Sequence, residues 1–270
     1  KDSAPSPRRL QYLRDYRRRK RSIRLWQVCL LAGLFALWEL TTRLGLSDGF
    51  LTSSPSRMAG TLQSLWHSGD LWRHIGTSCL ETVVGFTAGT LLGTAIAVAM
   101  WWWEKLARVL DPYLVVLNAL PKTALGPIFI VWMGAGMGAI IVMTLAISLI
   151  VTILSMYQGF LGTDSEKLRL MRSLGATRGQ ILWMLVFPAS FPTLFNTLKV
   201  NVGLSWVGVI MGEFLVSRAG LGYLIVYGSQ VFNMDLVMAS VVILAAAAVV
   251  MYRLVLGAEK LLQHYWGVKA

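Results

Sequence analysis

The chain has 270 residues, of which 56% are hydrophobic and only 14% charged, and its net charge is +12. Its mean hydropathy of +0.61 is far above that of a soluble domain. These values exclude a water-soluble globular protein and indicate a protein that lies largely in a membrane. The strong positive charge leaves two candidate partners, nucleic acid and the membrane surface, which the placement of the charges can separate.

Six long apolar runs recur along the chain, each near the ~20 residues that cross a hydrocarbon core of ~30 Å. Backbone polar groups cannot stay unpaired in lipid, and the runs are too long and continuous for barrel strands. The sequence therefore predicts an all-α polytopic membrane protein with six transmembrane helices and a cytoplasmic coupling helix. The runs cover residues 25–44, 79–103, 113–133, 139–157, 191–215 and 236–256.

Most cations fall on one side of the membrane if the N-terminus is cytoplasmic. This positive-inside pattern predicts that both termini are cytoplasmic. The basic arm, residues 1–24, is expected to set topology and touch anionic membrane lipid, and we expect no nucleic-acid partner. We expect a permease domain over 25–258, with a coupling loop at 158–188, and a cytoplasmic tail over 259–270. The cations on that side are Arg8, Arg9, Arg14, Arg17, Arg18, Arg19, Lys20, Arg21, Arg24, Lys105, Arg108, Lys167, Arg169, Arg172, Arg178, Lys260 and Lys269.

The basic arm followed by an apolar run also has the order of a secretory signal. The apolar part is longer than the ~7–15 residues of a signal core, and no small-residue cleavage site follows it. We therefore expect a retained anchor.

Three glycines recur every four residues in the second run, so they lie along one stripe of a helix. Small residues let helix backbones approach closely in a membrane. Gly85, Gly89 and Gly93 therefore predict a tight helix crossing, either within the chain or across a dimer.

Polar groups at membrane depth are costly and are functional candidates by default. Counted from Asp111 at about 1.5 Å per residue, Lys122 lies roughly 16 Å into the membrane. Lys199 has a comparable depth, so the two lysines could line a route for a small anion. Alternatively each pairs with a carboxylate and is structural; Glu81 and Glu213 are the acidic candidates, although both lie shallower. The candidate path residues are Asn118, Pro121, Lys122, Thr123, Lys199, Asn201, Ser205 and Glu213.

A polar, basic stretch at residues 164–180 interrupts the apolar runs. Its charges surround an amphipathic core, Leu168, Leu170, Met171 and Leu174, and Gly175 can end a short helix. Such a short helix is marginal in water, but it can be ordered when it docks on a partner. Residues 216–235 are apolar but broken by glycines, which predicts a re-entrant or interfacial helix on the outer face.

The strings in this chain that resemble catalytic or metal-binding motifs lack the neighbouring elements or the spacing that those motifs require. Residues 45–49 match G-x-S-x-G, but they close a membrane helix and do not follow a strand. The histidines are scattered without metal-ligand spacing, and no G-x-x-x-x-G-K-[ST] phosphate loop occurs. We therefore expect no enzyme active site, no metal site and no cofactor bound by this chain.

Gly175, Leu185, Phe187 and Pro188 fall at the spacing G-x9-[apolar]-x-[apolar]-P. This resembles the cytoplasmic EAA loop of type I ABC-importer permeases, in particular the nitrate/sulfonate/taurine/bicarbonate branch. The resemblance runs from about Leu110 to Trp266 through LDPYLVVLNALPKTALGPIFIVWMGAG, LGATRGQILWMLVFPASFPTL and GLSWVGVIMGEFLVSRAGLGYLI. One departure is Arg169, which stands where the family has glutamate.

The resemblance implies a docking helix that fits a groove on a separate ATPase, with Arg169, Arg172, Ser173, Leu174, Gly175, Ala176 and Arg178 as its residues. It further implies a homodimer of permease subunits, two ABC ATPase subunits that hold ATP and Mg, and an extracytoplasmic substrate-binding protein, in the bacterial plasma (inner) membrane. Closure of the ATPases would open the pore outward by alternating access, and a sulfonate, nitrate or bicarbonate is the expected type of solute.

Three alternatives differ in class. A related permease could carry a thiamine-precursor pyrimidine. A secondary transporter or channel would more often show an inverted repeat with interrupted segments, which is not detected here. A membrane-embedded enzyme would need catalytic motifs. An ATPase gene beside this one would indicate an ABC permease and would argue against a secondary transporter, a channel or an enzyme.

Overall fold

In this computed structural model, residues 7–46 and 48–266 are described, and every regular element in them is helical. The first six residues of the basic arm, residue 47 and the last four residues of the tail, with Lys269, lie outside the described residues. The elements are α1 (Pro7–Arg43), α2 (Gly49–Thr52), α3 (Pro55–Ser68), α4 (Asp70–Trp102), α5 (Glu104–Ala119), the 3-10 helix η1 (Lys122–Leu125), α6 (Gly126–Met133), α7 (Met137–Leu161), α8 (Ser165–Ser173), α9 (Arg178–Ile181), the π-helix η2 (Leu182–Val186), α10 (Phe187–Ala189), α11 (Phe191–Val216), α12 (Leu221–Gln230) and α13 (Met234–Trp266).

Five described helices are long and apolar enough to cross a membrane, namely α1, α4, α7, α11 and α13. The pair formed by α5 and the segment of η1 and α6 passes the same test together, but it is bent by 91°. The all-α polytopic class is therefore confirmed, with six spans when the bent pair is counted as one.

The continuous span expected over residues 113–133 is wrong. Helix α5 starts earlier, at Glu104, and ends at Ala119, and Leu120 is extended with ψ 141°. Pro121 explains this, because a residue that precedes proline is pushed out of the helical region. Pro127 then stands in the first turn of α6, where proline is tolerated. The depth counted for Lys122 along a straight helix therefore does not hold.

The expected domain boundaries at residues 24 and 258 do not coincide with helix ends. Helix α1 runs through the described part of the basic arm into the first apolar run, and α13 continues past residue 258 to Trp266. Neither junction has a proline, and the charged residues there are good helix formers, so the helices extend beyond the apolar segments that hydropathy detects.

The core is a sandwich of α4, α7 and α11. An added Cβ at Gly85 would lie 2.5 Å from Thr144 Cγ2, and one at Gly93 would lie 2.6 Å from Thr152 Cβ. From α11, a Cβ at Gly208 would lie 2.8 Å from the Cα of the same Thr144. The glycine stripe of α4 therefore crosses a helix of the same chain, and α4 and α11 both approach α7 closely.

The buried hydroxyl side chains of α7 donate their hydrogen bonds within their own helix. Thr144 donates to Ile140 O at 2.9 Å and Thr152 donates to Ser148 O at 2.8 Å. Each bond runs back to the carbonyl four residues earlier, which satisfies the hydroxyl inside its own helix.

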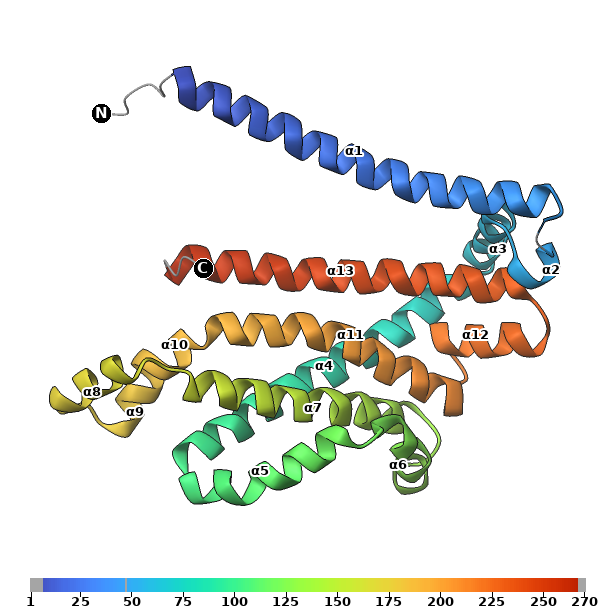
Figure 1. Cartoon of the computed structure of the whole chain (residues 1–270). Helices are drawn as coiled ribbons and strands as arrows, with labels where there is room; N and C mark the ends of the chain where they lie inside the picture. Colours follow the sequence, from blue (N-terminus) through green and yellow to red (C-terminus); the bar gives the residue numbers. More distant parts are fainter. Residues whose placement is uncertain (1–6, 47, 267–270) are drawn as a thin grey trace.

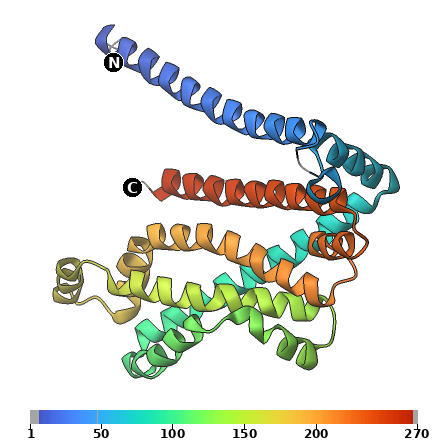
Figure 2. The same ribbon diagram turned by 45° about the vertical axis from the view of Figure 1, so that its right-hand side comes forward.

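The two described chain ends lie at the same end of the bundle as α8 and α9, as Figure 1 and the turned view of Figure 2 show. We call this end of the bundle the inner end, and the opposite end, which carries α2, α3, α6 and α12, the outer end. Helix α12 is a short helix packed between α11 and α13, with Leu221 and Leu224 buried. Residues 216–235 thus contain a ten-residue helix too short to span a membrane, and its interfacial position stays a prediction.

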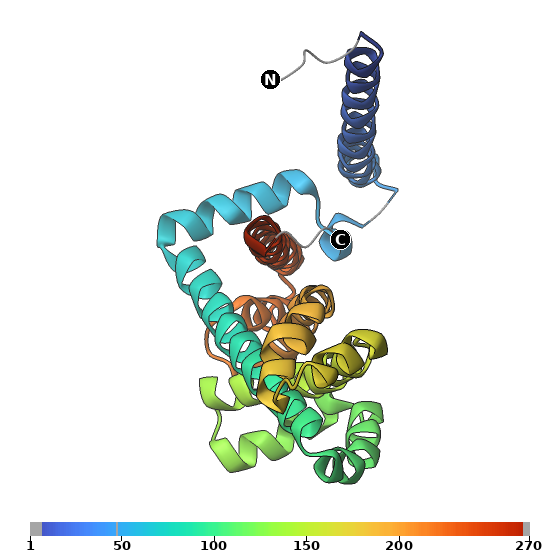
Figure 3. The same ribbon diagram turned by 90° about the vertical axis from the view of Figure 1, so that its left-hand side faces the viewer.

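Helix α1 stands apart from the bundle along most of its length, as the end view in Figure 3 shows. None of its most apolar window is buried. At its outer end it is joined to the segment before α4, where the Glu39 carboxylate accepts hydrogen bonds from Ser56 N at 3.0 Å and Ser56 Oγ at 2.9 Å.

Candidate functional site: the coupling segment and the polar groups of the spans

The coupling segment, residues 162–190 between α7 and α11, has helix caps that its own sequence specifies. The Asp164 side chain accepts from Glu166 N at 2.9 Å and caps the start of α8. At its end, Gly175 takes φ +78°, and the N–H groups of Gly175 and Ala176 donate to Arg172 O and Met171 O. This pair of bonds around a left-handed glycine is the Schellman motif. The expectation that Gly175 ends a short helix is confirmed.

Helix α8 presents two different faces. Leu168 and Met171 pack with Ala176 on a buried cluster at the inner end of α4 and α7. Leu170 and Leu174 are 59% and 73% exposed, respectively. The four residues expected to form one amphipathic core therefore divide: two hold α8 on the bundle, and two are left on the surface. Arg169 and Ser173 are exposed as well.

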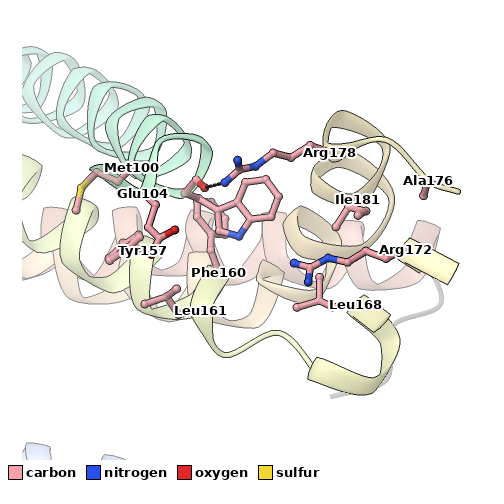
Figure 4. Close-up of a pocket in the computed structure, with 11 residues that line it drawn as sticks. Met100, Glu104, Tyr157, Phe160, Leu161, Leu168, Arg172, Ala176, Arg178 and Ile181 are labelled. Atoms are coloured by element: carbon pink, nitrogen blue, oxygen red, sulfur yellow. Dashed lines mark hydrogen bonds between the residues drawn. The ribbon is translucent and has the colours of Figure 1, made fainter. Parts of the chain in front are cut away.

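A cavity of about 560 Å³ lies between this segment and the inner ends of α4 and α7 (Figure 4). Arg172 of α8 and Arg178 of α9 both extend toward it, and Tyr157, Glu104 and Leu168 lie on its wall. Glu104 is already in an exposed ion pair with Arg108, at 2.6 Å. Among the described residues neither of the two cavity arginines is in an ion pair, so the cavity is basic.

Arg178 is fixed by contacts with α4. Its Nη2 donates to the Trp101 carbonyl oxygen at 3.0 Å, and its guanidinium carbon lies 5.4 Å and 5.9 Å from the ring centroids of Trp101 and Trp102. A cation over an aromatic face contributes about 0.5–1 kcal/mol at an exposed site. The expected coupling residues therefore differ in surroundings, because Arg178 is bound to the bundle whereas Arg169, Leu174 and Ser173 face outward.

The coupling segment continues into α11 through an irregular stretch. Thr177 forms a capping box with Gln180 at the start of α9, and η2 then loosens the helix into a π-turn. Proline follows at 188 and again at 192, in the first turns of α10 and α11. π-turns and prolines are where helices bend. The connection between α8 and α11 is therefore irregular and can bend.

The candidate path residues of the third span lie together at its break. Lys122 Nζ donates to the backbone oxygen of Asn118 at 3.0 Å and to its side-chain oxygen at 3.3 Å. Pro121 and Thr123 flank the lysine. These residues occupy the bend between α5 and α6, on the surface of the chain.

Lys199 is far from that group and is paired. Its Nζ lies 2.8 Å and 2.9 Å from the two carboxylate oxygens of Glu259 on α13, and the two side chains are 23% and 15% exposed. Glu81 and Glu213, the carboxylates considered from the sequence, are not its counterpart. The sequence did not reveal this pair because α13 extends past residue 258, which brings Glu259 beside α11. Lys199 therefore fits the alternative in which the lysine pairs with a carboxylate and has a structural role.

The remaining candidates of α11 are buried between helices. Asn201 Nδ2 donates to Thr152 Oγ1 of α7 at 2.7 Å, and Ser205 is fully buried one turn further on. Neither side chain lines one of the cavities described here. The path residues expected from membrane depth thus fall into separate environments: a surface bend, an ion pair and the helix interface.

A second cavity, of about 520 Å³, was not expected from the sequence. It lies along α7 and α11 in their inner halves and is lined by uncharged side chains. Its signal in the sequence is a group of hydrogen-bonding residues at helical spacing, which a search for charged residues passes over. The polar lining residues are Ser155, Gln158, Thr193, Asn196 and Thr197.

Glu213 belongs to a buried network at the outer end. Its carboxyl accepts hydrogen bonds from Ser78 Oγ of α4 and from Gly222 N. Leu221 N donates to Ser78 Oγ at 2.7 Å, and Gly220 N donates to His74 Nδ1 at 2.9 Å. The network fixes the turn between α11 and α12 on α4. His74 and Ser78 were not singled out from the sequence, because their partners are backbone groups nearly 150 residues away.

The chain matches the family described as "Binding-protein-dependent transport system inner membrane component" over residues 89–264. It is 29% identical over 231 residues to a probable ABC transporter permease protein of Haemophilus influenzae, covering 85% of this chain and 94% of the relative. The taurine transport system permease protein of Escherichia coli (strain K12) is 25% identical, with 81% of each chain covered. The formylaminopyrimidine transport permease protein of Halalkalibacterium halodurans is 27% identical, with 70% and 75% covered.

A structure of the MetNI methionine ABC transporter in inward-facing conformations is similar in fold. The TM-score is 0.56 at 18% identity, and the match covers 76% of this chain and 98% of the other.

Proposed function

Because the chain belongs to the family of binding-protein-dependent transport system inner membrane components, we propose that it is the gate of an importer driven by a separate ATPase. It is a permease subunit of an ABC importer, a multi-pass membrane protein and not itself an enzyme. In the proposal, α8 docks in a groove of the ATPase, and its displacement tilts α11 and changes which side of the membrane the path opens to.

The observation that carries this proposal is the exposed face of α8. Leu170 and Leu174 are large apolar side chains on a short helix that projects from the inner end of the bundle (Figure 1). An exposed apolar patch with a charged rim is typical of a protein interface. Arg169 supplies charge beside that patch, whereas Arg172 extends toward the cavity on the other side of α8, and acidic side chains of an ATPase are the proposed partners of Arg169. ATP and Mg bind to the ATPase, not to this chain.

The charges support a cytoplasmic position for α8 and for both termini. The start of α5 with Lys105, α8 with Lys167 and Arg169, and the last turns of α13 with Lys260 lie at the end of the bundle that also holds the two described chain ends, as does the basic part of α1. Loops rich in lysine and arginine remain in the cytoplasm. In this orientation the basic part of α1 faces anionic lipid, and α12 with the segment before α4 faces the binding protein on the outer side.

We propose two copies of the chain around one path. In this arrangement α1, whose apolar window is wholly exposed, and the cavity between α7 and α11 face protein or the path rather than lipid. Uncharged polar side chains at membrane depth are expensive in lipid, which supports placing that cavity on the path.

The proposed solute is a small anion such as a sulfonate, in line with the taurine relative, or nitrate or bicarbonate. Of the two lysines that favour an anionic solute, only Lys122 still supports it, because Lys199 is paired with Glu259. A second candidate is a formylaminopyrimidine-like solute. The uncharged lining of the α7–α11 cavity favours it, since amides and hydroxyls hydrogen-bond a neutral heterocycle without a charge partner.

The proposal is tested by purifying the tagged chain from membranes in mild detergent and reconstituting what copurifies. An ATP-hydrolysing subunit is expected, with ATP-dependent uptake once the binding protein is added. Radiolabelled taurine and a formylaminopyrimidine, supplied separately, distinguish the two solutes. Uptake in the absence of any ATPase would overturn the proposal and favour a secondary transporter.

A further inference from the structure

Helix α4 contacts a functional segment at each of its ends. It runs without a break from Asp70 to Trp102, which at about 1.5 Å per residue spans roughly 50 Å. Its inner end lies against the start of α9, and its outer end lies against the turn between α11 and α12 (Figure 1). The two contacts are made by different residues and with different chemistry.

The inner contact is Arg178, the first residue of α9. Its backbone follows directly after the Thr177 capping box, so it moves with the coupling segment. Its guanidinium holds α4 by a hydrogen bond to the Trp101 carbonyl and by stacking over the rings of Trp101 and Trp102. The carbonyls of the last helical turn have no partner within the helix, and a cation is favourable there.

The outer contact immobilises three consecutive amides of the turn. Gly220 N, Leu221 N and Gly222 N donate to His74, Ser78 and Glu213, respectively. Ser78 in turn donates to Glu213, so α4 and α11 share the turn. Gly220 has φ +123°, and a side chain there would collide with the Glu213 carboxyl. The turn is therefore fitted closely to α4.

Between the two contacts α4 cannot bend independently of the core, because its glycine stripe is interlocked with α7. A displacement of its inner end therefore moves the outer end as well.

We propose that α4 is a second transmission element beside α11: Arg178 ties it to the coupling segment, and the turn at residues 217–222 is what it moves on the outer face. This inference rests on the proposed function, since it takes α8 as the point where the ATPase acts. Arg178 is then a positioning residue, and its contact with α4, not its charge alone, carries the effect.

The test uses the copurified complex in lipid nanodiscs and hydrogen–deuterium exchange of the peptide that covers 217–224, with and without a non-hydrolysable ATP analogue and Mg²⁺. In the wild type the analogue changes the exchange rate of the turn by roughly fivefold, the usual net effect of losing or gaining one hydrogen bond. In Arg178→Met the analogue still binds, but the change falls below about twofold on the same scale. A wild-type response in this variant would overturn the proposal.

Three further variants separate transmission from docking. Arg178→Lys keeps the charge but cannot stack or donate in the same planar geometry, so it should behave like Arg178→Met; full recovery by lysine would assign Arg178 to ATPase docking and overturn the proposal. Arg108→Met, an exposed arginine of the same corner, should respond like the wild type. Ser78→Ala should raise the basal exchange of the turn and abolish its response; a retained response would contradict the outer contact. Absence of an ATPase from the wild-type complex would refute the proposed function instead.

Discussion

At the scale of single residues, Gly175 decides how the coupling segment turns. It combines φ +78° with a backbone N–H that donates to Arg172 O. Only glycine adopts such a conformation without cost, and asparagine tolerates it better than other residues. The direction in which Leu174 and the start of α9 point therefore depends on this one position.

Gly175→Pro should uncouple ATP hydrolysis from uptake, because proline cannot take a positive φ and has no N–H to donate. We expect a loss of coupling of roughly 1–3 kcal/mol, which is about 5–150-fold in solute moved per ATP hydrolysed. Hydrolysis and uptake are measured together in proteoliposomes. Gly175→Asn is the matched control and should retain most of the coupling; equal loss in both variants would indicate that the left-handed turn is not the cause.

The Lys199–Glu259 pair leads to the opposite kind of prediction. Lys199→Met leaves a half-buried carboxylate without its partner, which should destabilise the protein by about 1–3 kcal/mol. The measurement is the midpoint of thermal aggregation in detergent. The exchange Lys199→Glu with Glu259→Lys should recover most of the loss. A Lys199→Met protein of unchanged stability that fails to transport would restore Lys199 to the path.

These two residues also show what the sequence could predict. The left-handed cap follows from a glycine that comes directly after an amphipathic segment, which is a local signal. The ion pair joins residues 60 positions apart, and no local pattern indicates which carboxylate approaches a given lysine. Counting membrane depth along one helix predicted the same environment for Lys199 and Lys122. In the structure Lys199 pairs with Glu259 of α13, whereas Lys122 lies at a surface bend and bonds to Asn118.

At the scale of elements, the interlock of α4 and α7 determines the core. The glycine stripe alone predicted a close crossing, since three glycines at a spacing of four lie on one face. The sequence could not say which helix lies opposite. In the structure the three glycines face Thr144, Ser148 and Thr152 of α7, which are themselves spaced by four residues.

Gly89→Leu should prevent α4 and α7 from approaching, because even a Cβ at this position collides with Ser148 Oγ. Overpacking of a tight site costs about 1–3 kcal/mol or more, so we expect a marked loss of monodisperse protein in size-exclusion chromatography. Gly76→Leu is the control in the same helix, since no atom lies within 4 Å of a Cβ there. Equal yields of the two variants would mean that the crossing is not tight.

The bend of the third span shows where hydropathy fails. The run over 113–133 has the composition of a span, and a hydropathy average is insensitive to geometry. Pro121 pushes Leu120 out of the helical region, and the helices on either side of this break meet at 91°. The residues that break the helix were visible in the sequence, but the direction and size of the bend depend on how α6 packs on α7.

At the scale of the whole molecule, one end of the bundle carries the described chain ends, the basic part of α1 and the coupling segment, and the other carries α2, α3, α6, α12 and the buried network around Glu213. This polarity suits the proposed gate, on which an ATPase acts at one end and to which a binding protein delivers solute at the other. The detached position of α1 leaves a long apolar surface, for which a second copy of the chain is the proposed partner.

The most direct test of the account is whether the exposed face of α8 binds a separate ATPase. The tagged chain is purified with its partners, and the molar ratio of ATPase to chain is measured for the wild type, for Leu174→Asp and for Leu46→Asp. Both leucines are strongly exposed, at 73% and 76%. Leu174 directly follows α8 and Leu46 lies just after α1, and these two helices end at opposite ends of the bundle. The account predicts that Leu174→Asp alone loses the ATPase, by roughly tenfold or more for about 1.4 kcal/mol of lost binding. An unchanged ratio in Leu174→Asp, or a transport-active wild-type chain without any ATPase, would contradict it.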